Sequence, residues 1–170
     1  MIMPRGSDQL LLPVNPIFIA LSLLVALVVN LLPLGRLPGL PDLLALTLAF
    51  WAVHQPRRVG VGLSFLCGLL MDVHQGALLG QHALAYTLLA FVSLALSRRL
   101  TWFTLAQQAL QVLPLFVATH AVSLLVRLAA GDLFPGWSLF IAPLIEAALW
   151  PFVTLLLLAP QRRAPDPDEN

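Results

Sequence analysis

The side chains of this chain that could take part in chemistry are a few ionisable groups set within long apolar runs. Glu146 lies nine residues after Trp137, which is about 14 Å along a helix. His120 lies eight residues before Leu128 in the preceding run, at a comparable depth from the same side. An acid and an imidazole at matching depth could share a proton or a hydrogen bond. The alternative is that Glu146 only joins helices by bonding a neighbouring backbone or glutamine group.

The most patterned polar stretch reads GLLMDVHQGALLGQHAL over residues 68–84. We expect Asp72 to close one helix, and Gly76 and Gly80 to permit a tight reversal and close backbone contact at the start of the next. The carboxylate could bond the free amides that begin this next helix, where the helix dipole favours an anion. A metal site needs three or four ligands at fixed geometry. Asp72 with His74 and His82 supports such a site only weakly.

Two further polar features have local explanations. Asp42 stands where an N-cap residue would accept bonds from the first free amides of a helix beginning at Leu43. Thr104, Gln108 and Gln111 recur at helical spacing, which predicts a polar stripe facing other helices or a cavity. No phosphate-binding glycine loop, nucleophile elbow, zinc-protease helix or kinase signature occurs. The sequence therefore predicts no catalytic residues, no metal, no cofactor and no enzymatic activity.

The elements that position these side chains are predicted to be membrane helices. Of the 170 residues, 59% are hydrophobic and 10% are charged, and the mean hydropathy is +0.91. Too little polar surface exists to cover a water-soluble fold. All nine basic residues are arginine and the net charge is only +1, which excludes a nucleic-acid-binding protein with a concentrated basic face. The single cysteine, Cys67, excludes a disulfide framework.

Charged residues, glycines and prolines divide the chain into a compact all-α bundle of six predicted transmembrane helices. Their expected bounds are 16–34, 43–53, 59–71, 77–97, 104–128 and 137–159. The second and third reach only some 17–20 Å, less than the hydrocarbon thickness. Gly60, Ser64 and Gly68 share one face of the third helix, which predicts that this helix is central. Trp51, Trp102 and the tryptophan at 137 are expected to anchor helix ends at the interface.

Arginine placement predicts the orientation, because short cytoplasmic loops carry an excess of positive charge. One side receives seven arginines and the other receives two, Arg36 and Arg127. The seven are Arg5, Arg57, Arg58, Arg98, Arg99, Arg162 and Arg163. Both termini are therefore expected in the cytoplasm, with residues 1–15 as an N-terminal segment, 16–160 as the transmembrane domain and 161–170 as a polar tail. The pairs 57–58 and 98–99 could also hold anionic lipid or an acidic partner, or they could only set the topology.

Three stretches resemble the MreD family of rod shape-determining proteins of Gram-negative bacteria. They are PDLLALTLAFWAVHQPRRVGVG over 41–62, the stretch at 68–84 described above, and LIEAALWP over 144–151. The resemblance implies a non-enzymatic multi-pass scaffold of the bacterial inner membrane that acts in lateral peptidoglycan synthesis and rod shape. It implies direct binding of MreC, membership of a complex with MreB, RodA and penicillin-binding protein 2, and contact with membrane lipids. It also implies a fold similar to the substrate-binding subunit of energy-coupling factor transporters.

That similarity of fold supplies an alternative function, a subunit of a membrane transporter that binds a small, vitamin-like molecule. This alternative predicts a ligand pocket that opens outward near Asp72, His74 and Gln81. The scaffold reading predicts that the same turn instead shapes the outer face that meets MreC.

Overall fold

Six α-helices account for most of the residues that the computed structural model describes, 14–32 and 39–161, and no strand occurs within those ranges. The helices are α1 (Pro16–Leu31), α2 (Leu43–His54), α3 (Val61–Gln75), α4 (Gln81–Leu100), α5 (Leu105–Ala129) and α6 (Ile141–Leu158). Short 3₁₀ turns, Trp137–Phe140 and Ala159–Gln161, precede and follow α6. The predicted all-α class is confirmed for the described residues.

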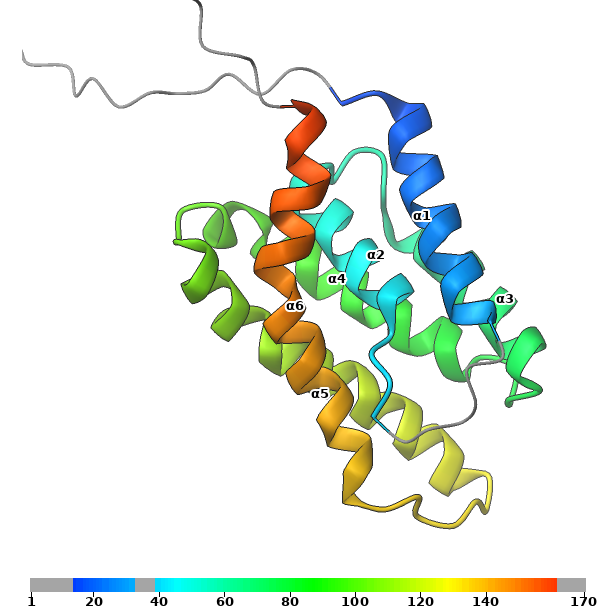
Figure 1. Cartoon of the computed structure of the whole chain (residues 1–170). Coiled ribbons are helices and arrows are strands. Elements are labelled where there is room, and N and C mark those ends of the chain that lie inside the picture. The colour runs from blue at the N-terminus through cyan, green and yellow to red at the C-terminus, as the bar shows by residue number, and fades with distance from the viewer. Residues whose placement is uncertain (1–13, 33–38, 162–170) are drawn as a thin grey trace, which may run out of the picture.

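The shortest helix, α2, forms the centre of the bundle (Figure 1). Ten of its twelve residues are buried, and it packs against α1, α4 and α6. Trp51 is fully buried in this helix and donates from Nε1 to Ser22 Oγ at 2.8 Å. The expectation that Trp51 anchors an interface is therefore wrong. By contrast, Trp102 and Trp137 are 89% and 79% exposed.

The predicted central place of the third helix is also wrong. α3 packs chiefly on α4 and leaves Phe65, Leu66 and Leu70 exposed. Of its small residues, Gly68 is the one at a close contact, because a Cβ there would lie 2.3 Å from the Cα of Ala83 on α4. Nothing lies within 4 Å of a Cβ built on Gly60. A stripe of small residues identifies one close helix pair, but it does not say how many other helices surround that pair.

Within residues 14–32 and 39–161, three helical stretches are long and apolar enough to cross a membrane: α4, α5 and the stretch Trp137–Gln161 that contains α6. α1, α2 and α3 are apolar but shorter, with 16, 12 and 15 residues. A helix of 12 residues is about 18 Å long, so α2 does not cover the hydrocarbon thickness as a straight span. The chain is thus a helical membrane protein, and the count of six spans stays a prediction.

The boundaries of α3 and α4 differ from those expected. α3 runs to Gln75, so Asp72 lies inside its last turn and does not end it. The end comes at Gly76, which takes the left-handed conformation at φ 60, while the amide of Ala77 donates back to the carbonyl of Asp72. Gly80 at φ 105 then precedes α4, which begins four residues later than expected.

The two ends of the described chain, Val14 and Gln161, lie at the same end of the bundle (Figure 1). The α2–α3 loop and the α4–α5 turn lie toward that end, and the α3–α4 turn and the α5–α6 loop lie toward the other. The 57–58 and 98–99 arginine pairs lie in or beside the α2–α3 loop and the α4–α5 turn, and all four side chains are exposed. Most of the predicted terminal segments 1–15 and 161–170 lies outside the described residues, including Arg5, Arg162 and Arg163, and so does Arg36.

Candidate functional site: a buried polar cluster

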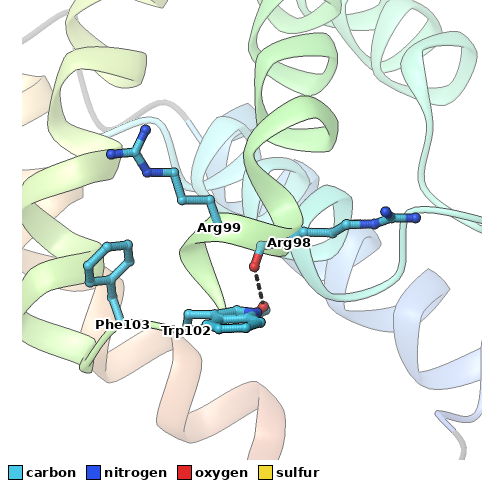
Figure 2. Close-up of a pocket in the computed structure, with 5 residues that line it drawn as sticks. Arg98, Arg99, Trp102 and Phe103 are labelled. Carbon is cyan, nitrogen blue, oxygen red and sulfur yellow. Dashed lines mark hydrogen bonds between the residues drawn. The ribbon is translucent and has the colours of Figure 1, made fainter.

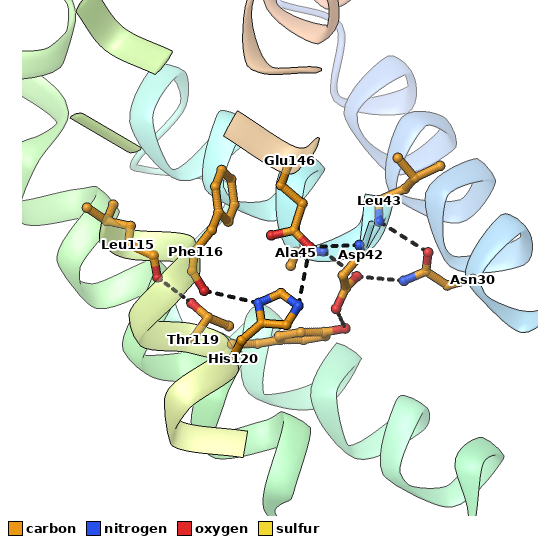
Figure 3. Close-up of polar contacts among 10 residues, drawn as sticks. Asn30, Asp42, Leu43, Ala45, Leu115, Phe116, Thr119, His120 and Glu146 are labelled. Carbon is orange, nitrogen blue, oxygen red and sulfur yellow. Dashed lines mark hydrogen bonds and ion pairs between the residues drawn. The ribbon is translucent and has the colours of Figure 1, made fainter. Parts of the chain in front are cut away.

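Asp42 is the centre of a polar cluster at the N-terminal end of α2 (Figure 3). Its Oδ1 accepts the amide of Ala45 at 2.9 Å, which confirms the predicted N-cap. The same carboxylate accepts from Asn30 Nδ2 at 2.6 Å and from the hydroxyl of Tyr86. Three donors thus converge on one carboxylate, and two of them come from other helices.

Asn30 and Tyr86 are the functional residues that sequence reasoning missed. Asn30 lies in the last turn of α1 and also accepts the amide of Leu43 at 3.2 Å, so it holds the end of α1 against the start of α2. Tyr86 is fully buried in α4 and is the only tyrosine of the chain. A polar group within an apolar helix was the available signal in both cases, because such a group needs a partner.

Glu146 joins α6 to the same cluster. It is fully buried, and its Oε1 accepts the backbone amide of Asp42 at 2.8 Å. His120 on α5 places Nε2 at 3.4 Å from the same oxygen, so the predicted contact between Glu146 and His120 is present. The cluster therefore gathers side chains from α1, α2, α4, α5 and α6.

His120 bonds the backbone of its own helix through one ring nitrogen and faces Glu146 with the other. His120 Nδ1 lies 3.0 Å from the carbonyl oxygen of Phe116, which can only accept, so this nitrogen carries hydrogen. The other ring nitrogen, Nε2, is the one that faces Glu146 Oε1. Among the described residues, Glu146 Oε2 is buried and has no hydrogen-bond partner.

Asp72 forms a second buried site, between α3 and α4. Its Oδ2 accepts the amide of Gly80 at 2.8 Å and that of Ala83 at 3.3 Å. Its Oδ1 accepts the amide of His82 at 2.7 Å and lies 2.9 Å from Nδ1 of the same residue. The carboxylate of α3 therefore caps α4, as predicted, and all of these partners lie at Gly80 or in the first turn of α4.

The two buried sites are adjacent through one aromatic contact. The ring of His82 lies edge-on to Tyr86, with ring centroids 5.9 Å apart. Because Tyr86 bonds Asp42, the polar contacts continue from α3 through α4 to α2. No group of three or more His, Cys, Asp or Glu side chains within 14–32 and 39–161 could hold a metal ion. The arrangement can fix helices relative to one another.

The remaining predicted site residues are positioned separately. His74 is exposed, while Gln81 is buried. Gln108 accepts from Trp150 Nε1 at 3.1 Å, so part of the predicted polar stripe joins α5 to α6. Arg127 pairs with Asp132 at 3.1 Å on the exposed α5–α6 loop.

Comparisons with known proteins give a family and one relative. Residues 11–159 match the family described as rod shape-determining protein MreD. The rod shape-determining protein MreD of Haemophilus influenzae (strain ATCC 51907 / DSM 11121 / KW20 / Rd) is 32% identical over 135 residues, which cover 77% of this chain and 81% of the relative. No solved structure matches. The expected likeness to energy-coupling factor subunits therefore stays a prediction.

Proposed function

Because this chain belongs to the MreD family of rod shape-determining proteins, we propose that it is a non-enzymatic scaffold of the bacterial elongation complex. In this proposal it crosses the inner membrane six times with both termini in the cytoplasm. It binds MreC directly, and through the complex it is linked to MreB, RodA and penicillin-binding protein 2. By holding these partners it helps to control rod shape and lateral peptidoglycan synthesis.

The observation that carries the proposal is the use of the buried polar groups. Asp42, Asp72 and Glu146 all bond backbone amides at or near helix starts, within the bundle. Such bonds fix helix positions, and a scaffold needs fixed outer faces for its partners. None of these three carboxylates lines the depression at the α4–α5 turn or the one between α4 and α5 beside Pro114.

The transporter alternative is not favoured by this geometry. It required an outward pocket near Asp72, His74 and Gln81. Asp72 has both oxygens engaged by the start of α4, and Gln81 is buried in that helix. The depressions found among the described residues lie elsewhere, at the α4–α5 turn and between α4 and α5 beside Pro114.

For MreC we propose the outer turn between α3 and α4 as the contact surface. Leu78 and Leu79 are 47% and 74% exposed on this turn. Asp72 holds the backbone of the turn by accepting the amide of Gly80. Apolar side chains on a short rigid turn suit the edge of a protein interface. The turn lies at the end opposite the termini, where the topology predicts the periplasm.

The test is a mild-detergent pull-down of the tagged protein from native membranes, with mass spectrometry of the proteins retained. Recovery of MreC with RodA or penicillin-binding protein 2 is expected. Leu79→Asp should lower recovery of MreC at least fivefold, whereas Leu133→Asp, on the exposed α5–α6 loop, should not. Recovery of paired ATPases with their coupling subunit, in place of MreC, would overturn the scaffold.

A further inference from the structure

The α4–α5 turn carries a depression that the proposed scaffold does not use. It is open, measures about 550 Å³, and is lined by Arg98, Arg99, Thr101, Trp102 and Phe103. Both arginines and Trp102 are exposed. In Figure 2 the two guanidinium groups extend to either side of Trp102, and Phe103 lies on the same side as Arg99.

We propose that this depression binds the headgroup of an anionic phospholipid. Its phosphate would bond the guanidinium group of Arg99, Arg98 would attract it by charge from the other side of Trp102, and the first part of its acyl chains would lie along the rings of Trp102 and Phe103. The proposal goes beyond the scaffold function and does not depend on MreC.

Charge is the first observation that supports this occupant. The three ion pairs found within 14–32 and 39–161 involve other residues, so no described carboxylate neutralises Arg98 or Arg99. The turn leads into α5, whose first turn contains no acidic residue. Two arginines beside a helix start without acidic residues attract a phosphate, which guanidinium groups bind through paired hydrogen bonds.

The aromatic rings select a lipid over a soluble phosphate. Trp102 is 89% exposed although it is a large apolar side chain, and an indole ring is favourable at the level of lipid headgroups. A free phosphate or an acidic peptide in water gains little from such a surface. A phospholipid gains from both parts of the site, since it joins a negative phosphate to apolar chains.

The Arg57–Arg58 pair provides a matched control. These two arginines are also adjacent and exposed, on the α2–α3 loop at the same end of the bundle. The depression that contains Arg98 does not include them. A general attraction between basic residues and an anionic membrane would treat the two pairs alike.

The experiment uses the full chain, purified in mild detergent with equal amounts of phosphatidylglycerol and phosphatidylethanolamine, and counts retained lipids by native mass spectrometry. Retention of phosphatidylglycerol in preference to phosphatidylethanolamine is expected. R98Q/R99Q should weaken it roughly 10- to 30-fold, since each surface arginine contributes about a factor of five. Trp102→Ala should weaken it less, and R57Q/R58Q should leave it within about twofold.

Several outcomes would overturn the proposal. Equal loss in R57Q/R58Q would indicate diffuse attraction, and unchanged retention in R98Q/R99Q would show that no site exists. Displacement of the lipid by millimolar glycerol phosphate would identify a soluble phosphate as the ligand. A large gain of lipid on removal of residues 164–170, which include Asp166, Asp168 and Glu169, would make the chain's own acidic residues the occupant.

Discussion

Glu146 on α6 accepts the backbone amide of Asp42 at 2.8 Å, across 104 residues of sequence. Asp42 is the N-cap residue of α2, so its amide bonds Glu146 while its side chain caps the helix. One side chain of α6 therefore holds the residue that caps the central helix. The two helices are joined where Glu146 is fully buried and Asp42 is half-buried.

Two substitutions of Glu146 should distinguish the role of its hydrogen bond to Asp42 from any role of a carboxyl proton. Glu146→Gln keeps a carbonyl oxygen at the position of Oε1 for the amide of Asp42 and removes the carboxyl group, so we expect less than about 1 kcal/mol of lost stability. Glu146→Ala leaves the amide unsatisfied and should cost about 1–3 kcal/mol. Unfolding in detergent, with rod-shape complementation of a strain depleted of its own MreD, measures both effects. If Glu146→Gln complements fully, the shared proton has no role in function; a stable but inactive Gln variant would establish one.

The bond between Tyr86 and Asp42 should appear as coupling in a double-mutant cycle. Tyr86→Phe removes a buried hydroxyl that donates to a carboxylate and should cost about 1.5–3 kcal/mol. In an Asp42→Asn background, where the N-cap is kept, the same change should cost at least about 1 kcal/mol less. Denaturant unfolding of the four proteins measures the coupling. Additive costs would show that the hydroxyl does not depend on the charge of residue 42.

Gly68 and Gly62 offer a matched pair on α3. A methyl group at Gly68 would lie 2.3 Å from the Cα of Ala83, so Gly68→Ala should push α3 from α4 and cost about 3 kcal/mol. Gly62 has nothing within 4 Å of such a methyl group, so Gly62→Ala should be neutral or gain about 0.5–1 kcal/mol. Thermal unfolding of both variants in the same detergent distinguishes them. Similar stabilities would contradict the close packing of α3 on α4.

The arginine count predicts topology that reporters can test. A reporter active only in the cytoplasm should work when fused after Asn170 and fail when inserted beside Asp132 on the α5–α6 loop. A periplasmic reporter should give the reverse pattern. A silent cytoplasmic reporter after Asn170 would overturn the predicted orientation. Active cytoplasmic reporters at both positions would overturn the predicted crossing by α6.

Apolar length and local polar spacing determined much of this protein from the sequence alone. The helical class, the cap by Asp42 and the cap by Asp72 all follow from bonds between residues close in the chain, from 3 to 11 positions apart. The sequence also predicted the contact between His120 and Glu146, because the two residues lie at similar depths from the same side of the membrane in their two helices. Family resemblance rested on the same stretches and is confirmed.

Only the tertiary structure decided which helix is central and which buried groups share a partner. An apolar helix has the same composition whether lipid or protein surrounds it. The sequence therefore did not show that α2, and not α3, is the central helix. The bonds from Asn30 and Tyr86 to Asp42 span 12 and 44 residues and depend on how the helices pack and rotate. Hydropathy shows that a helix lies away from water. Packing among several helices at once decides which helices are its neighbours.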